Sequence, residues 1–514
     1  MIKKILFIAI FAIALLYRLP NLQTPFWVDE FSTARNALLF QRFGLSVFTQ
    51  HDELFEHHNV TQHALVSLFF QLFGQTERAA RLPSVLIGSA IPVAVFLLAR
   101  SLYDRETALA ASLFATFSYF QIAWSRQARS YMLLQLLILL SLWTYHRLVK
   151  HFEVKKLLYL TALIILGIVT HTTFWIVVIG MIFHAVYLGF HWHLFSLNTF
   201  RRYWHYGAAV LGIFGGLMLF NGSGGTVIAN LLVALRNHPN NLWYYHSFLW
   251  REHTLMSFLA GLGVLMNFFH YKKGTFLLVV PAGLFLVFVS FVFGPYVSRY
   301  ILPIYPLILI LASFALATVS HSIAAKKATG FVLLLALFII ANGDTFVIKP
   351  KAYYSVNHDM REIALLDYDL VYSIIKQKVM SSSQPVAIVD TWPDRARWYL
   401  GYENPNMFYF HWENEQGTVN GLAKTTAVSL LNSEKVLPNF SSPAIRFVGS
   451  LDDFQKVMNQ YQHGFVWIDD SSLPADVVEF AQQYLRKEIH LDHYPLDDNP
   501  YSIWPGTLYS WGFE

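Results

Sequence analysis

Long apolar segments recur along the first two-thirds of this chain, and they constrain its fold more than any other feature. A helix that crosses a membrane needs about 20 apolar residues, with roughly 17–25 tolerated. Eleven such spans are predicted at 5–20, 83–101, 107–123, 132–148, 157–171, 173–190, 207–221, 254–270, 275–293, 301–319 and 329–343. Charged residues make up only 13% of the 514 residues, against about 25% in an ordinary globular domain. We therefore expect a polytopic α-helical membrane protein.

The direction of the chain follows from its basic loops. Lys and Arg occur between alternate spans, in "MIKK", "YDRE", "KHFEVKK", "FRRYWH", "HYKKG" and "HSIAAKK". Because such loops stay on the cytoplasmic side of the inner (plasma) membrane, the N-terminus is predicted to be cytoplasmic. With eleven crossings, the part of the chain after residue 344 is then predicted to be extracytoplasmic. The first segment continues into "YRLPN" without a small-residue cleavage site, which favours a retained anchor over a signal peptide.

The composition changes at about residue 345, where a polar and aromatic region begins. The short apolar runs "PVAIVD" (385–390) and "GFVWID" (464–469) are typical of buried strands, and each precedes a helical pattern. We predict two domains, a transmembrane domain at 1–344 and an extracytoplasmic α/β domain at 345–514. The chain has no cysteine, so disulfides and a Cys nucleophile are excluded.

Ionisable and aromatic side chains collect on the predicted extracytoplasmic loops. Because charges at span ends are costly beside lipid, they tend to mark a cavity or a pathway. The candidates are Asp29, Glu30, Arg35, Glu56, His57 and His58 on the first loop, Arg126, Arg129 and Tyr131 on the second, His171 on the third, and Arg299 and Tyr300 near the start of the span at 301–319. We expect the acids and the arginines to face one chamber.

This combination of charges suits sugar transfer from a lipid carrier. A polyprenyl-phosphate sugar keeps its tail in the bilayer and its phosphate at the headgroup level. Its displacement needs a base that takes the proton of the acceptor and cations that hold the leaving phosphate, for which the planar fork of Arg is well suited. A carboxylate with several arginines at one depth meets both needs.

Several motifs resemble the membrane glycosyltransferases of the GT-C fold, in particular the broad bacterial branch of the protein O-mannosyltransferase and lipid A aminoarabinose transferase superfamily. The matching stretches, which cover about residues 1–345, are "WVDEFSTARNA", "LFGQTERAARLPSVLIG", "RQARSYMLLQL", "GIVTHTTFW" and "SRYILPIYPLILILA". The resemblance implies a GT-C fold and a polyprenyl-phosphate sugar donor. It also implies a glycan, lipid or protein acceptor.

The resemblance also implies roles for individual residues. Asp29 would be the general base, and Glu30 would support it. Arg126 or Arg129, with Tyr131, Arg299 and Tyr300, would bind the donor phosphate. Relatives often carry a His-Pro-Pro or Lys-Pro element where this chain has Glu56, His57 and His58 without a proline. That departure leaves open which group there contacts substrate and whether those three residues hold a divalent cation.

Simpler interpretations remain open for each site. Asp29 and Glu30 would then be solvated charges, Arg126 and Arg129 would reach anionic headgroups from one helical face, and His171 would cap a turn. Adjacent histidines such as His57 and His58 diverge on a helix, which disfavours a metal pair. At the level of the whole protein, a flippase for a lipid-linked substrate or an inactive scaffold is the alternative. A flippase should carry ionisable groups at mid-span, and the predicted span interiors are nearly free of them.

Overall fold

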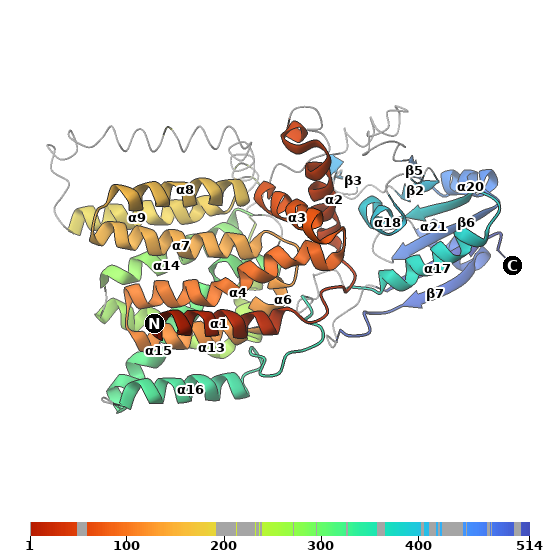
Figure 1. The fold of residues 1–514 in the computed structure, drawn as a ribbon. Helices are drawn as coiled ribbons and strands as arrows, with labels where there is room; N and C mark the ends of the chain where they lie inside the picture. Colours follow the sequence, from red (N-terminus) through yellow and green to blue (C-terminus); the bar gives the residue numbers. More distant parts are fainter. Residues whose placement is uncertain are drawn as a thin grey trace. The chain divides into compact units, whose positions relative to one another are not determined.

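The structure is a computed structural model whose chain divides into two compact units (Figure 1). One unit consists of Met1–Leu22 and Glu56–Val356, and the other of Gln23–Phe55 and Asn357–Glu514. The first part of the first loop, Gln23–Phe55, therefore belongs by its contacts to the same unit as the carboxyl-terminal part of the chain. The described residues are 2–48, 59–191, 212, 232, 236, 239–270, 272–293, 296–324, 327–356, 365–401, 404, 406–410, 418–419, 422–423, 446–448, 450–469, 473, 475–497 and 505–513.

The first unit is built of helices. They are α1 (Ile2–Arg18), α3 (Val60–Phe73), α4 (Glu77–Leu102), α5 (Arg105–Phe117), α6 (Tyr119–Ser125), α7 (Tyr131–Lys150), α8 (Val154–Thr170), α9 (Phe174–His191), α12 (Leu242–Glu252), α13 (Thr254–His270), α14 (Lys272–Phe291), η2 (Ser298–Tyr300), η3 (Leu302–Ile304), α15 (Tyr305–Ala324) and α16 (Ala328–Asn342). Figure 1 shows the long helices of this unit side by side, and α4 packs on both α5 and α7.

Three of these helical segments are long and apolar enough to cross a membrane, among the residues that the structure describes. They are Glu77–Leu102, Tyr131–Lys150 and Ser298–Ala324. Shorter apolar helices occur at Val60–Phe73, Phe174–Gly189, Thr254–Phe269, Phe276–Phe291 and Ala328–Asn342. The unit thus has the helical, lipid-compatible character that the sequence predicted.

The predicted spans coincide with helices wherever the structure describes them, and 207–221 lies almost entirely outside the described residues. The span predicted at 107–123 is two helices, because Ser118 leaves the helical conformation and caps α6 through its hydroxyl. Ser118 also pairs with Phe346, in the segment after α16. The turn predicted at His171 is confirmed, since α8 ends at Thr170 and α9 begins at Phe174.

The second unit contains a six-stranded mixed sheet of order β5-β2-β1-β6-β8-β7. Its strands are β1 (Val386–Asp390), β2 (Met407–Phe410), β5 (Arg446–Val448), β6 (His463–Asp469), β7 (Arg486–Leu491) and β8 (Gly506–Trp511). The first four run parallel, and β8 joins β6 antiparallel. A two-stranded ribbon of β3 (Thr418–Val419) and β4 (Leu422–Ala423) is separate. Both predicted strand runs, at 385–390 and 464–469, are strands here.

Helices cover both faces of the sheet in this unit. On one face, Val389 and Val466 pack with Phe454 of α20 (Leu451–Gln460) and Val477 of α21 (Ala475–Tyr484). Successive side chains of a strand point to opposite faces of the sheet, so Asp390 points away from α20 and α21. The helices α17 (Tyr368–Ser381) and α18 (Pro393–Leu400) lie on the face to which Asp390 points. The side chain of Tyr372 in α17 donates a hydrogen bond to Asp390.

The first loop contributes α2 (Val28–Phe43) and the short η1 (Gly44–Phe48) to the second unit. The helix α2 contacts α18. Its first turn carries Asp29 and Glu30, where carboxylates are favoured by the unpaired amide groups and the dipole of the helix. The carboxylate pair singled out in the sequence therefore lies at a helix N-terminus that packs on the carboxyl-terminal part of the chain.

Candidate active site

The two adjacent acids of α2 have different environments. The Glu30 side chain is fully buried, and its Oε2 accepts a hydrogen bond of 3.0 Å from the backbone N–H of Trp27. Glu30 is the third residue of the helix, so this contact is the carboxylate half of a capping box. Asp29 is partly exposed. Of the pair, Glu30 fixes the start of α2, and Asp29 is the one whose carboxylate is more accessible to a substrate.

Arg126 and Arg129 lie in the turn between α6 and α7. The prediction that they share one helical face is therefore wrong: α6 ends at Ser125, and the N–H of Arg126 bonds back to Ala123 in a tight terminal turn. The polar run "SRQARS" lacks the apolar periodicity that would continue a buried helix. Arg129 contributes its carbonyl to this turn, which accepts a hydrogen bond from Ser84.

Arg126 is 5% exposed and carries its charge into the interior of the first unit. Its Nη2 donates to the carbonyls of Pro20, Asn21 and Ala352, and the guanidinium lies 4.8 Å from the ring centroid of Tyr354. Its Nε and Nη1 have no hydrogen-bond partner among the described residues. An oxyanion is the kind of group that suits such donor nitrogens chemically.

The environment of Arg126 holds a second buried cation. Burial, followed by the positive charge of Arg81, lowers the pKa of Arg126 to about 10, so it stays charged at neutral pH. Arg81 is 2% exposed and donates from Nη1 to the carbonyl of Leu22 at 3.0 Å. It belongs to the "RLPS" motif, to which the sequence interpretation gave no role. The motif could have identified Arg81 as a candidate. An arginine near the start of an apolar helix is costly beside lipid, so it tends to face the protein interior.

The remaining candidates of the first unit lie at helix ends and turns. The ring of Tyr131, at the start of α7, is 5.9 Å from that of His171. The Nδ1 of His171 contacts the Thr173 hydroxyl at 2.8 Å and accepts from the Thr173 N–H at 3.3 Å, so His171 caps the turn before α9. The Arg299 guanidinium lies 5.7 Å from the ring of Tyr300, its neighbour in η2.

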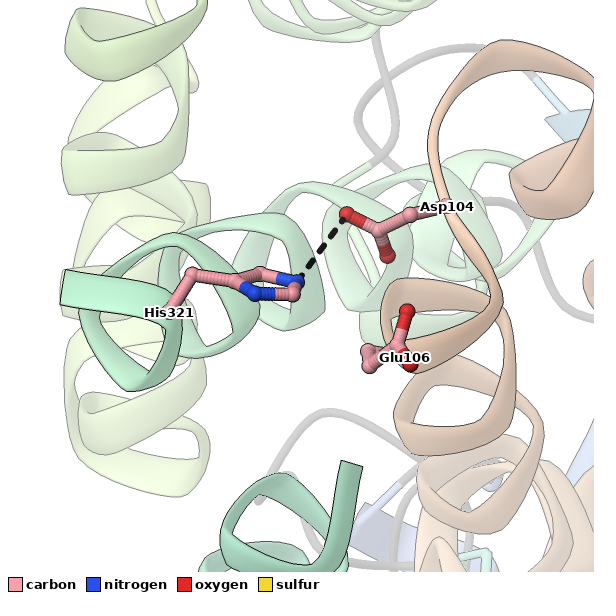
Figure 2. Close-up of side chains that lie close together, drawn as sticks. All are labelled: Asp104, Glu106 and His321. Atoms are coloured by element: carbon pink, nitrogen blue, oxygen red, sulfur yellow. Dashed lines mark ion pairs between the residues drawn. The ribbon is translucent and has the colours of Figure 1, made fainter. Parts of the chain in front are cut away.

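Glu56, His57 and His58 lie outside the described residues. Within the described part of the chain, one group of three side chains has the composition of a cation site. It consists of Asp104, Glu106 and His321, whose ligand atoms lie within 4.8 Å of one another (Figure 2). The Nε2 of His321 is 3.9 Å from the Oδ2 of Asp104, and Glu106 accepts a hydrogen bond from Thr329. The sequence interpretation did not predict this group.

This cluster is remote from the arginines of the predicted phosphate site. His321 lies near the end of α15, whereas Arg299 precedes its beginning at Tyr305. At 1.5 Å per residue, the sixteen residues from Tyr305 to His321 span about 24 Å. Asp104 caps α5 and Glu106 lies in its first turn, within the "YDRE" segment that was predicted to be cytoplasmic. An ion held by these three residues would be too far from Arg299 to contact the same phosphate.

The second unit has its own buried charged cluster at the carboxyl ends of β1 and β6. Arg395 of α18 is 1% exposed, donates to Asp390 and lies 3.6 Å from Asp469. Burial alone would lower the pKa of Arg395, but Asp390, Tyr372, Tyr368 and Asp469 together outweigh burial and hold the pKa well above its ordinary value. The runs "PVAIVD" and "GFVWID" both end in these acids, although the sequence alone did not identify their partner.

The first unit thus combines apolar helices with two buried arginines, Arg81 and Arg126, at or near helix ends. A family model described as dolichyl-phosphate-mannose-protein mannosyltransferase matches residues 57–221. A search of curated proteins gives no match. The matched range begins just before α3 and includes both Arg81 and Arg126.

Comparison with solved structures gives the particular fold. ArnT from Cupriavidus metallidurans in the apo state has 13% identity and a TM-score of 0.61, over 99% of this chain and 97% of that chain. The same protein bound to undecaprenyl phosphate has 12% identity and a TM-score of 0.58, over 99% and 98%. The Archaeoglobus fulgidus oligosaccharyltransferase complex with Zn and sulfate has 13% identity and a TM-score of 0.50, over 89% and 67%. The resemblance to GT-C membrane glycosyltransferases is confirmed at the level of the fold.

Proposed function

We propose that this protein is an integral-membrane glycosyltransferase that moves a sugar from a polyprenyl-phosphate donor to an acceptor on the extracytoplasmic face. The observation that carries the proposal is the ArnT-like fold, which extends over 99% of this chain. The ArnT structure with undecaprenyl phosphate supports a lipid-phosphate donor of the same class, and the family match supports transfer of a sugar.

The reaction would be a single displacement. Asp29 takes the proton from an acceptor hydroxyl, whose oxygen attacks the anomeric carbon of the donor sugar. The bond from that carbon to the phosphate oxygen breaks, and polyprenyl phosphate leaves with the electron pair. One displacement inverts the configuration of the anomeric carbon. Glu30 supports the reaction by holding the first turn of α2 through its contact with Trp27.

The leaving phosphate would be held by Arg126 through the nitrogens that have no partner among the described residues. Arg81 adds positive charge beside it. Arg129, Tyr131, Arg299 and Tyr300 are further candidates for the phosphate or the sugar. Glu56, His57 and His58 remain the candidates for a divalent cation at this face, because Asp104, Glu106 and His321 lie at the far end of α15.

The membrane arrangement belongs to the same proposal. It has about eleven spans, a cytoplasmic N-terminus in the bacterial inner membrane and an extracytoplasmic α/β domain after residue 344. The helices found at the described spans and the mixed sheet of the second unit support this arrangement. A flippase is not favoured, because charges in the described part of the chain lie mainly at helix ends and not at mid-span.

Replacing Arg126 by lysine tests the proposed phosphate contact. Lysine keeps the charge but loses the planar fork. Because hydrogen bonds to charged groups contribute about 1.5–3 kcal/mol, the donor dissociation constant should rise roughly tenfold or more. Protection of the purified protein against thermal unfolding, titrated with a panel of polyprenyl-phosphate sugars, measures this change.

The matched control is Arg147→Lys, since Arg147 is an exposed arginine near the other end of α7 that lies over the ring of Trp143. Its protection curve should equal that of the unmodified protein. If Arg126→Lys gave the same protection curve as the unmodified protein, Arg126 would not be part of the phosphate site. If no lipid-phosphate sugar protected the unmodified protein, the proposed donor class would be wrong.

A further inference from the structure

The short helix α18 connects two sets of contacts within the second unit. It follows β1 directly, through Thr391 and Trp392, and its eight residues read "PDRARWYL". Some of its side chains contact the sheet and α17, others contact α2, and Tyr399 contacts both α17 and α2. Because α2 carries Asp29, the contacts of α18 bear on the position of the proposed general base.

The contacts of α18 with the sheet are made by Arg395. Its Nη2 donates to the Asp390 carboxylate and, at 2.8 Å, to the Thr391 hydroxyl. Its guanidinium also lies 4.9 Å from the ring centroid of Tyr368 in α17. A buried pair with this many additional partners holds one geometry, since any displacement would leave a buried charge without compensation.

A stacked aromatic pair adds to this attachment. Tyr399 of α18 lies against Tyr372 of α17, with ring centroids 4.8 Å apart and planes 13° from parallel. Burial and the charge of Asp390 raise the pKa of Tyr372 well above its ordinary value, so its phenol stays protonated and donates to Asp390. The helix α18 is therefore fixed to β1 and α17 by charge, hydrogen bonds and stacking together.

The helix α18 contacts the chain on both sides of Asp29, just before α2 and within α2. Before it, the ring of Phe26 is 4.8 Å from that of Trp398. After it, Phe31 meets Tyr399 at 6.0 Å, and Arg35 Nη1 forms an ion pair of 3.0 Å with Asp394 Oδ2. The two side chains of this pair are 26% and 17% exposed, so they are shielded from solvent more than a typical surface pair.

We propose that α18 is the element that positions Asp29 for catalysis, with Arg35 and Asp394 as its positioning pair. The inference rests on the proposed function and assigns to the carboxyl-terminal part of the chain a direct effect on the rate of transfer. Displacement of a reacting group by about 1 Å can cost on the order of 100-fold in rate. Loosening α2 at Arg35 should therefore lower kcat while the donor still binds.

The experiment compares Asp394→Ala and Arg35→Ala with the charge-exchanged double variant Arg35→Asp/Asp394→Arg in the full-length protein. Each single variant should lower kcat by about tenfold, at an unchanged KM for a polyprenyl-phosphate sugar. The double variant should recover part of the loss, because it restores the ion pair with its charges exchanged. Hydrogen exchange of the α2 amides should be faster in both single variants.

The control is Lys456→Ala, which breaks the ion pair between Lys456 and Asp453 on α20. It should leave kcat and the exchange of α2 unchanged. Wild-type kcat in Asp394→Ala would overturn the positioning role while leaving the proposed function in place. An unmodified protein that transfers no sugar from any donor would instead overturn the proposed function, and the positioning role would fall with it.

Discussion

Replacing Asp29 by asparagine is expected to lower kcat for sugar transfer by about 10²–10⁴-fold, the range that a positioned general base contributes. Asparagine keeps the shape of the side chain but cannot take the proton of the acceptor. Donor binding should persist, because the proposed phosphate contacts are made by other residues. Turnover of a labelled polyprenyl-phosphate sugar measures the first effect, and thermal protection by the same donor measures the second.

A matched control exists within the same unit. Asp452 is the second residue of α20, as Asp29 is the second residue of α2, and it is exposed. Asp452→Asn removes a carboxylate from an equivalent helix position, so it controls for the interaction with the helix dipole. It should leave turnover unchanged. Wild-type turnover in Asp29→Asn would mean that the protein acts as a scaffold or uses another base.

Replacing Arg395 by alanine should destabilise the second unit strongly. Asp390 would then keep a buried charge without its guanidinium partner, a change that costs about 3–5 kcal/mol in other buried pairs. In the full-length protein, exchange of the β1 and β6 amides should become roughly 10²–10³-fold faster, if these amides exchange through opening of the sheet.

The control for this variant is Lys456→Ala, which breaks the exposed ion pair between Lys456 and Asp453. Exposed ion pairs contribute only about 0–1 kcal/mol to stability. Exchange of the same amides should change little in that variant. If Arg395→Ala left the exchange of β1 and β6 at its original rate, the buried cluster would not be what stabilises the sheet, and the rigidity assigned to α18 would lose its support.

Local patterns in the sequence predicted most of the secondary structure. Apolar length predicted the helices, and the runs ending at Asp390 and Asp469 predicted β1 and β6. The break at Ser118 was not predicted. Ser118 caps α6 and also pairs with Phe346, more than 200 residues later in the chain, and a local pattern does not reveal such long-range pairing. The grouping of α2 with the carboxyl-terminal part was missed for the same reason: its contacts with Asp394 and Tyr399 are long-range.

The candidate site was predictable in its residue types but less so in its geometry. A loop carboxylate and arginines at span ends follow from the cost of charges beside lipid. The sequence did not reveal that Glu30 caps α2 while Asp29 stays partly exposed, since adjacent acids look equivalent until the helix start is known. Nor did it reveal that Arg126 turns inward to three backbone carbonyls beside Arg81, because such contacts depend on how the helix ends pack.

The most direct measurement is the anomeric configuration of the product formed from a polyprenyl-phosphate sugar of known configuration. Asp29 as the general base of a single displacement predicts a product of inverted configuration, with free polyprenyl phosphate released in equal amount. A product of retained configuration would require a covalent intermediate or a second displacement. That result would contradict the mechanism.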